Sequence, residues 1–505
     1  MKPELQNLID LDRERVLVAH IASLLAWDQE THMPPGAEEE RAEQLAWLEG
    51  SAHEKAVDPR IGEHLAALGC SDSNPGGDPS LDPDARAFLR VLYRTYAREV
   101  KLPADLVTET AKAQSLGQSA WVRARSENDF SAFRPHLERI LDLKRRAAAC
   151  LDPDKKPYDV LLDLFEPGSD EAQVRRVFDP LRKDLSSLLA RIRSRPQVDD
   201  SFLRKPCSKE AQTTASRYFM ELLGYDLDRG RLDVTAHPFT TTVGRADVRI
   251  TTRYDEGYFL SSLFSTIHET GHALYEQGVN PPAEYAGTCL ADGASMGIHE
   301  SQSRMWENVV GRSRPFWSRE YPALRAVLGE VLSGVSLDAF LRGINKVEPS
   351  LIRTEADEVT YGLHIILRFE MEADLLAGRL AVQDVPAAWN AKTRDLLGIE
   401  PPSDAKGCLQ DVHWSAGLFG YFPSYSLGNL YAAQFVQALR KDLDLDGRLR
   451  EGDYASVLGW LRKHIHTPGA ALLPNELCEK VTGKPLDAAH FVDYLNRKYA
   501  EIYGF

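Results

Sequence analysis

The chain has 505 residues, of which 43% are hydrophobic, and a formal net charge of −15 at pH 7. This length and hydrophobic content suffice for a large core, and length alone allows roughly two to four domains. The acidic balance argues against a nucleic-acid-binding surface. No run approaches the roughly 18 consecutive apolar residues that a membrane span needs. We therefore expect a soluble protein that binds neither nucleic acid nor membrane.

The first residues and the cysteines indicate a cellular compartment. Residues 1–7 lack the basic-then-apolar plan of a secretory signal peptide. The six cysteines are scattered and form no C-x-x-C pair, which is typical of reduced, mostly buried thiols. The sequence therefore predicts a cytoplasmic protein whose cysteines are neither nucleophiles nor zinc ligands.

Helical periodicity dominates the first part of the chain, to about residue 230. The predicted helices are residues 8–27, 38–48, 85–100, 104–125, 130–151, 171–193 and 208–223. Residues 71–79 are the clearest loop, and because the helical pattern resumes at Asp84 we interpret it as a surface excursion. We interpret residues 1–230 as a helical wall or lid over a groove. Residues 247–253 then alternate polar and apolar, which predicts a short half-buried strand.

A candidate metal site follows in residues 265–275, where His268 and His272 lie on either side of Glu269. Apolar residues at three- and four-residue spacing predict a helix here, with Gly271 close to a neighbouring element. On a helix, histidines four residues apart leave the same face one turn apart. Their nitrogens can then reach one metal ion at about 2.0–2.1 Å. Glu269 points to the side of the pair, where a general base can contact a metal-bound water.

A catalytic zinc ion needs a third protein ligand and keeps a fourth position for water. Residues 292–304 form the next polar-rich helix candidate, and Glu300 on that helix is our candidate for the third ligand. Glu276 would have to reach along the helix axis, and His299 would face elsewhere. Spacing alone nevertheless leaves four alternatives open: His299, Asp292, Glu276 and Glu284.

Six motifs occur in order along the second part of the chain. They are His237-Pro238-Phe239, Asp247-x-Arg249-x-Thr251, His268-Glu269-x-x-His272, His299-Glu300-Ser301-Gln302, Ile352-Arg353-x-x-Ala356-Asp357 and Gly407-x-x-Gln410-Asp411-x-His413-Trp414. A further segment, Leu25-x-Trp27-Asp28-x-x-Thr31-x-Met33-Pro34, extends the match over almost the whole chain. On these motifs the chain resembles the thermostable metallocarboxypeptidase family typified by carboxypeptidase Taq, zinc peptidases of the His-Glu-x-x-His class.

The resemblance implies a fold and an activity. The expected fold is a mainly α-helical single domain over residues 1–505, similar to neurolysin and angiotensin-converting enzyme, with a deep central groove. A small β-element lies beside the metal-binding helix, and residues 231–505 hold the metal site and the substrate groove. The resemblance also implies a homodimer that uses zinc, for which cobalt can substitute. Its expected reaction releases carboxy-terminal amino acids from peptides with broad specificity, with proline disfavoured.

The resemblance assigns Glu300 as the third metal ligand beside His268 and His272. With zinc held there, Glu269 takes a proton as the metal-bound water attacks the scissile carbonyl, and then delivers it to the leaving amine. Asp292 and Asp357 are candidate partners for the ligand imidazoles.

The tetrahedral oxyanion needs donors besides the metal. The glycine-rich loop 417–425 carries Tyr421 and Tyr425, and either phenol is a candidate donor. Each tyrosine can equally pack a helix junction. His413 is a candidate for a hydrogen bond to the substrate or the intermediate.

An exopeptidase acting at the carboxy end must bind a free carboxylate, for which the planar arginine fork is suited. Arg353 is the first candidate, with a structural ion pair as the alternative. Arg249 is the second, although it can instead pair with Asp247 or Asp357 and brace the strand. His237 precedes a proline in an extended segment and is a candidate for lining the groove.

Three functional classes follow from these features. The first is a zinc carboxypeptidase, and the second is a zinc endo- or oligopeptidase of the same fold, which would not require a free carboxy terminus on its substrate. The third is a non-catalytic zinc protein. Glu269 argues against the third class, because a structural site has no use for a base beside an open position.

Overall fold

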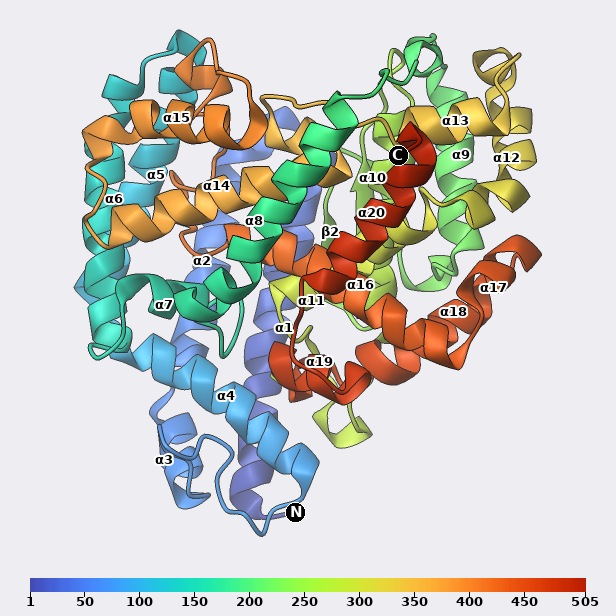
Figure 1. Cartoon of the computed structure of the whole chain (residues 1–505). Helices are drawn as coiled ribbons and strands as arrows, with labels where there is room; N and C mark the ends of the chain where they lie inside the picture. Colours follow the sequence, from blue (N-terminus) through green and yellow to red (C-terminus); the bar gives the residue numbers. More distant parts are fainter. The chain divides into compact units, whose positions relative to one another are not determined.

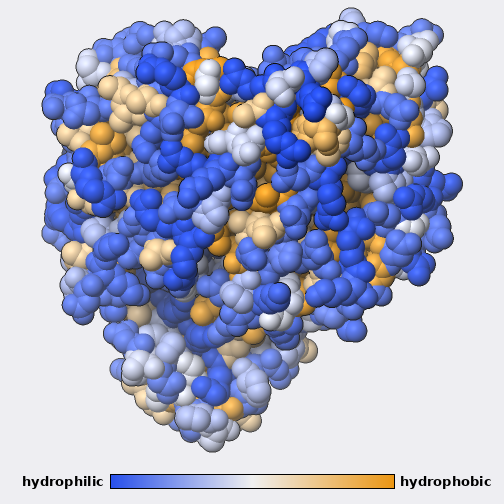
Figure 2. Space-filling model, in the orientation of Figure 1, coloured by the Kyte–Doolittle hydropathy of each residue, from blue (hydrophilic) through white to orange (hydrophobic).

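The computed structural model describes residues 1–505 and is mainly α-helical, as predicted, with twenty α-helices and three short strands (Figure 1). Hydrophilic residues dominate the face shown in Figure 2, with hydrophobic residues interspersed among them. That surface agrees with a chain in which 27% of the residues are charged. No helix combines the length and the apolar composition that a membrane crossing requires.

The chain divides into two compact units, each assembled from three separate segments. The first unit comprises Met1–Val100, Asp199–Ile344 and Phe435–Gly483, and the second comprises Lys101–Val198, Asn345–Gln434 and Lys484–Phe505. One helix, α16 (Phe422–Asp442), begins in the second unit and ends in the first. The single domain expected over residues 1–505 stays a prediction.

The first unit contains all three strands and most of the short helices. Its elements are α1 (Pro3–Thr31), α2 (Glu38–Ala56), α3 (Pro59–Ala67), α4 (Pro83–Lys101), α9 (Lys209–Leu222), β1 (Leu232–Val234), β2 (Thr240–Gly244), β3 (Asp247–Thr252), α10 (Leu260–Gly278), α11 (Met296–Arg304), α12 (Arg314–Leu328), α13 (Leu337–Ile344), α17 (Leu445–Glu451), α18 (Tyr454–Leu461) and α19 (Pro474–Thr482). A π-helical turn, Met305–Val310, follows α11 directly. The strand predicted at residues 247–253 is β3.

The strands form one sheet in the order β1-β3-β2, in which β1 runs parallel and β2 antiparallel to β3. Helix α10 packs against β3 and β2 on one side and against α11 on another. In the register of β2 with β3, Thr241 lies opposite Arg249. Because side chains alternate along a strand, Thr240 and Thr242 lie together on the other face of the sheet. The sheet therefore lies directly beside the helix that carries the predicted metal ligands.

A hydrophobic core fixes the segment between α10 and α11. Side chains of α1, α3 and α4 pack together there with Tyr285 and Leu290, which come from that segment. Asp12 on α1 is fully buried, and its Oδ2 accepts a hydrogen bond from the backbone N–H of Cys289 at 2.6 Å. A buried carboxylate with a charge-assisted bond of this kind is costly to displace. The start of α11 is thus held in place from the far end of the chain.

The second unit is helical throughout. Its elements are α5 (Ala104–Glu127), α6 (Phe130–Leu151), α7 (Pro157–Leu162), α8 (Glu171–Arg193), α14 (Glu358–Leu376), α15 (Val385–Leu397), the first part of α16 and α20 (Ala489–Tyr503). Helix α14 is buried along almost its whole length and packs against α8 and α15. It begins at Glu358, because Asp357 accepts the backbone N–H groups of Val359 and Thr360 and so caps the helix.

The glycine-rich segment 417–425 is only partly the loop that the sequence predicted. Helix α16 starts at Phe422, so Tyr421 precedes the helix and Tyr425 lies in its first turn. Pro423 favours this early start, since proline fits the first turn of a helix, where its missing N–H has no partner to lose. The tyrosines therefore sit at a helix beginning, one on each side of the boundary.

Candidate metal centre

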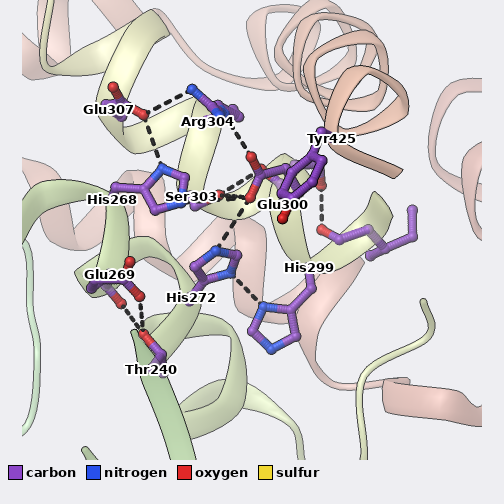
Figure 3. Close-up of polar contacts among 12 residues, drawn as sticks. Thr240, His268, Glu269, His272, His299, Glu300, Ser303, Arg304, Glu307 and Tyr425 are labelled. Carbon is purple, nitrogen blue, oxygen red and sulfur yellow. Dashed lines mark hydrogen bonds and ion pairs between the residues drawn. The ribbon is translucent and has the colours of Figure 1, made fainter. Parts of the chain in front are cut away.

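Three side chains of the first unit converge at one point. His268 and His272 come from α10, and Glu300 comes from α11. Glu300 Oε2 lies 3.5 Å from His268 Nε2 and 3.3 Å from His272 Nε2. One ligand atom from each residue lies within 4.8 Å of the other two (Figure 3). The structure thus brings together the three residues that the sequence singled out.

This arrangement fits a metal ion on its own geometry and chemistry. A tetrahedral ion with ligand distances of about 2.0–2.1 Å separates its ligand atoms by about 3.3–3.4 Å. The two separations measured from Glu300 Oε2 are close to that value. Two imidazole nitrogens and one carboxylate oxygen are also a donor set that zinc accepts.

His268 is oriented by a residue that the sequence analysis missed. Its Nδ1 lies 2.9 Å from Oε2 of Glu307, in the π-helical turn after α11. An Nδ1–H that donates to this carboxylate leaves the lone pair on Nε2, which faces Glu300. Burial lowers the pKa of His268, but Glu300 and Glu307 raise it above its ordinary value. The carboxylates that attract a proton here would attract a metal cation in its place.

His272 is oriented by a second histidine. Its Nδ1 lies 2.5 Å from Nδ1 of His299, and His299 Nε2 lies 2.7 Å from Glu276 Oε1. His299, expected to face elsewhere, therefore contacts a predicted ligand. Burial lowers the pKa of His272 to about 3, which keeps this imidazole neutral. Asp292, a candidate imidazole partner, accepts the backbone N–H of Gly293 on its Oδ1.

Glu300 is held ionised and in place by its own helix. Arg304 Nε donates to Glu300 Oε1 at 2.7 Å, and the Ser303 hydroxyl donates to Oε2 at 3.0 Å. Burial raises the pKa of Glu300, but Arg304 and His268 hold it well below its usual range. The carboxylate is therefore a charged acceptor at neutral pH, as a metal ligand must be.

The two helices that carry the predicted ligands approach closely at Gly271. A Cβ placed on Gly271 would meet the Ser303 Cα at 2.6 Å and the Gln302 carbonyl oxygen at 2.7 Å. Only glycine leaves room for this approach. The predicted closeness of Gly271 to a neighbouring element is confirmed, and the neighbour is α11.

Glu269, the predicted base, is buried next to the sheet. The hydroxyl of Thr240 on β2 lies 2.6 Å from Glu269 Oε2 and 3.1 Å from the Glu269 carbonyl oxygen. Burial raises the pKa of this carboxyl, and His268 and Thr240 oppose the rise. A carboxyl whose proton affinity is raised in this way is suited to taking a proton and returning it.

A buried charge cluster occupies the second unit. Arg353 donates from Nε and Nη2 to Asp411 Oδ1 at 3.0 and 2.9 Å, and Arg368 donates from Nε to Oδ2 at 2.7 Å. Arg353 Nη1 also donates to the Tyr361 hydroxyl at 3.2 Å. The two arginines hold the pKa of Asp411 far below its usual range although burial raises it. Two guanidinium groups thus share one carboxylate, which leaves the trio with a formal charge of +1.

The other predicted groups of the second unit gather beside this cluster. His413 Nε2 lies 3.2 Å from the Tyr425 hydroxyl, and burial lowers the pKa of His413 to about 4. Tyr421 packs edge-on against Tyr425, with ring centroids 5.2 Å apart. The Arg353 guanidinium lies 4.9 Å from the Tyr425 ring centroid. Four predicted site residues of the second unit are therefore neighbours.

Two predicted substrate residues lie on or beside the sheet of the first unit. Arg249 on β3 makes two bonds to Asp247, at 2.8 and 2.7 Å, and lies over the Trp27 ring at 4.2 Å. These contacts are the bracing alternative considered for Arg249. His237 is exposed in the bend between β1 and β2.

Comparison with known proteins identifies related chains. Residues 7–499 match the model of the family described as carboxypeptidase Taq (M32) metallopeptidase. The chain is 44% identical to Thermostable carboxypeptidase 1 of Thermus thermophilus, with all of both chains covered. It is 40% identical to Carboxypeptidase 1 of Bacillus subtilis, covering 99% of this chain and 98% of the relative. The crystal structure of the M32 carboxypeptidase from Deinococcus radiodurans superposes with a TM-score of 0.95 at 40% identity, with all of both chains covered.

Proposed function

The chain belongs to the carboxypeptidase Taq (M32) family and is a metallocarboxypeptidase, a hydrolase of peptide bonds, and from this we propose its metal, mechanism and specificity. The proposed metal is zinc, bound by His268, His272 and Glu300, with cobalt able to replace it. The observation that carries this proposal is the approach of both imidazole Nε2 atoms to the same oxygen of Glu300, at 3.5 and 3.3 Å.

In the proposed mechanism, a zinc ion held by His268, His272 and Glu300 would supply a Lewis acid for the scissile carbonyl and would lower the pKa of a bound water to about 7. Glu269 accepts the proton of the attacking water on its carboxylate and then donates it to the nitrogen of the leaving amine. The burial of Glu269 supports this role, because burial raises the pKa of its carboxyl and excludes bulk water from the transfer. His268 and Glu300 hold their orientation through Glu307 and Arg304 while the proton moves.

We propose that Arg353 binds the terminal carboxylate of the peptide. Its cluster with Asp411 and Arg368 supports this role, because it carries one formal positive charge more than its own carboxylate compensates. A buried surplus charge is costly until an anion completes it, and the arginine fork binds a carboxylate with directional hydrogen bonds. Arg249 forms an ion pair with Asp247 on its own strand and is the weaker of the two arginine candidates for binding the terminal carboxylate.

Tyr421, Tyr425 and His413 are proposed as donors to the substrate or to the oxyanion that forms during attack. Their shared neighbourhood with Arg353 supports this grouping. His413 is neutral because burial lowers its pKa to about 4, so it can donate one hydrogen bond without bringing a charge. His237 is proposed to line the substrate groove, and we propose a broad specificity in which proline is disfavoured.

The test measures release of the last residue from an amino-blocked dipeptide and from the same peptide with an amidated carboxy end. Wild type, a chelated sample and Glu269→Gln are compared. We expect cleavage of the free acid alone, loss of cleavage on chelation, and a loss of kcat of about 100-fold or more in Glu269→Gln with zinc still bound. Equal cleavage of the amide would favour an oligopeptidase and overturn the carboxylate role of Arg353.

A second variant tests Arg353 itself. Arg353→Met leaves Arg368 paired with Asp411, so the buried carboxylate keeps a cation. Loss of charge-assisted bonds to the substrate should lower kcat/KM for the free acid about 10- to 100-fold. The chelator-stripped and zinc-loaded unfolding curves should stay as far apart as in wild type. An unchanged kcat/KM would show that another group binds the carboxylate.

The assembly, fold relationship and location are also proposed. The family resemblance supports a homodimer with a deep central groove in a single neurolysin-like or angiotensin-converting-enzyme-like domain. The cytoplasm is the proposed location, and six cysteines without a disulfide support a reducing compartment. Light scattering of the purified chain measures the oligomeric state directly, and a monomer at micromolar concentration would contradict the dimer.

A further inference from the structure

Strand β2 presents three consecutive threonines whose side chains alternate between two faces. Thr240 and Thr242 point to the face that α10 covers, and Thr241 points to the opposite face. The two hydroxyls on the α10 face each bond a glutamate of that helix. Those glutamates, Glu269 and Glu276, are seven residues apart and therefore lie on one face of α10, two turns apart. One short strand thus forms hydrogen bonds with both side-chain carboxyl groups of α10, the helix that supplies two predicted ligands.

The bond from Thr240 fixes the predicted base. The hydroxyl lies 2.6 Å from Glu269 Oε2 and 3.1 Å from the carbonyl oxygen of the same residue (Figure 3). When the carboxylate is ionised, the hydroxyl can donate to Oε2. When the carboxyl carries a proton, that proton can be donated to the threonine oxygen, while the hydroxyl turns to the carbonyl oxygen. Thr240 therefore offers Glu269 a partner before and after the proton transfer, at the same position.

The bond from Thr242 acts on a metal ligand through two intermediaries. Thr242 donates to Glu276 Oε2 at 3.0 Å, and Glu276 Oε1 lies 2.7 Å from His299 Nε2. His299 Nδ1 in turn lies 2.5 Å from His272 Nδ1. If His299 Nε2–H donates to Glu276, its Nδ1 accepts from His272 Nδ1–H, and the lone pair of His272 is left on Nε2. That nitrogen is the one that faces Glu300.

We propose that β2 is a positioning strand of the catalytic site, in which Thr240 acts through Glu269 on proton transfer and Thr242 acts through Glu276 and His299 on the metal ligand His272. The proposal rests on the proposed function for the roles of Glu269 and His272. It assigns two separate effects to two neighbouring threonines, so each can be removed without the other. Neither threonine touches the substrate or the metal in this role.

The test compares three isosteric variants, Thr240→Val, Thr241→Val and Thr242→Val, with Thr240→Ser. Valine keeps the shape and the β-branch of threonine and removes only the hydroxyl. Thr241→Val is the matched control, since its side chain faces away from α10. The measurements are kcat and KM for an amino-blocked dipeptide, the zinc dissociation constant by competition with a chromophoric chelator, and the thermal unfolding midpoint of the metal-free protein.

For Thr240→Val we expect kcat to fall about 10- to 100-fold, because the variant loses one hydrogen bond to a charged group. KM and the zinc dissociation constant should match those of Thr241→Val, and Thr240→Ser should recover most of kcat. For Thr242→Val we expect zinc to bind roughly 10-fold more weakly, at the low end of effects transmitted through ligand partners. At saturating zinc, kcat of Thr242→Val should equal that of Thr241→Val.

Each part can fail separately. A kcat of Thr240→Val equal to that of Thr241→Val overturns the role of Thr240, and an unchanged zinc affinity of Thr242→Val overturns the role of Thr242. Equal losses in all three valine variants would indicate general damage to the sheet and overturn both. Failure of the proposed function gives a different result, because zinc-loaded wild type would then cleave the amidated dipeptide as readily as the free acid, or would cleave neither of them. In that case the zinc affinity of Thr242→Val still decides its part.

Discussion

Gly271 on α10 lies against the backbone of Ser303 on α11, so closely that a single added methyl group would sit 2.6 Å from the Ser303 Cα. This contact lies between His268 and His272 on one helix and just after Glu300 on the other. The spacing of the two helices that carry the proposed metal ligands is therefore set by one glycine. The same contact decides whether the carboxylate can approach both imidazoles.

The first prediction follows from that spacing. Gly271→Ala must push α10 and α11 apart, which should cost about 1–3 kcal/mol of unfolding free energy, as overpacking does. Because the ligand atoms then separate, zinc should bind at least about 10-fold more weakly. Denaturant unfolding of the metal-free protein and chelator competition measure the two effects. The matched control is Gly459→Ala on α18, where an added Cβ meets nothing within 4 Å. Equal results for both variants would contradict the argument.

The second prediction concerns the carboxylate behind His268. Glu307→Gln keeps the size of the side chain and removes the charge that accepts from His268 Nδ1. Loss of a carboxylate partner of a ligand histidine should weaken zinc binding about 10- to 100-fold. Glu330→Gln, at an exposed glutamate of the same unit, is the control. Isothermal titration with zinc after chelator removal measures both, and identical affinities would mean that Glu307 does not orient the ligand.

The third prediction concerns the shared carboxylate of the second unit. Asp411→Asn leaves Arg353 and Arg368 buried together without a compensating charge. Removal of one partner from a buried ion pair costs about 3–5 kcal/mol, so the free energy of unfolding at pH 7 should fall by that order.

Acid unfolding supplies the second readout for Asp411. Its folded pKa is lowered, so its contribution to stability is present above the ordinary carboxyl pKa and is lost as pH falls below it. The difference in unfolding free energy between wild type and Asp411→Asn should therefore become smaller between about pH 4 and pH 2. Urea unfolding at pH 7, 4 and 3 measures it. A gap that stays constant over this range would show that the carboxylate charge is not what stabilises the cluster.

The fourth prediction uses Glu372 on α14, which is fully buried. It accepts hydrogen bonds from Tyr158, from the Trp414 indole and from the backbone N–H of Gly420. Burial raises its pKa from 4.5 to about 7. A raised acid pKa means that stability is fully present below pH 4.5 and is lost as pH rises through 7.

Glu372→Gln, which cannot ionise, should not show this loss. Relative to the variant, wild type should lose up to about 3 kcal/mol of unfolding free energy between pH 5 and pH 8, from the size of the shift. The amide also presents an N–H to one of three donors, so the variant should be less stable at pH 5. Urea unfolding at four values from pH 5 to pH 8 measures how the unfolding free energy of each protein changes with pH. Parallel pH dependences of wild type and Glu372→Gln would contradict a raised pKa of Glu372.

Much of the candidate metal centre could be predicted because it depends on the spacing of residues along one helix. The four-residue spacing of His268 and His272 fixes their common face without any tertiary information. The position of Gly271 in the apolar stripe of the same helix also indicated a close neighbour. Glu300 could be chosen only through the family resemblance, since spacing left four other residues open.

The partners of the ligands could not be predicted because they come together only in the folded chain. Glu307 lies seven residues after Glu300, a spacing that places both on one helix face, and this was the available signal. The π-helical turn that carries it has no clear pattern in the sequence. Thr240 was missed because β2 was not predicted, although three consecutive β-branched residues favour a strand there. Arg353 and Asp411 belong to predicted motifs, but their pairing is a tertiary contact 58 positions apart.

The interleaving of the two units has a consequence for synthesis of the chain. His466, from the last segment of the first unit, bonds Gln302 across 164 positions and lies against Gly278 at the end of α10. A ribosome adding about 5–20 residues per second delivers that histidine roughly 8–30 s after Gln302. During this interval the middle segment of the second unit, Asn345–Gln434, is added to the chain. Helices α10 and α11, which carry the proposed metal ligands, are therefore expected to stay partly packed until His466 is added. Stalled nascent chains that end before residue 466 should be cleaved by added protease near α10, and chains released at full length should not.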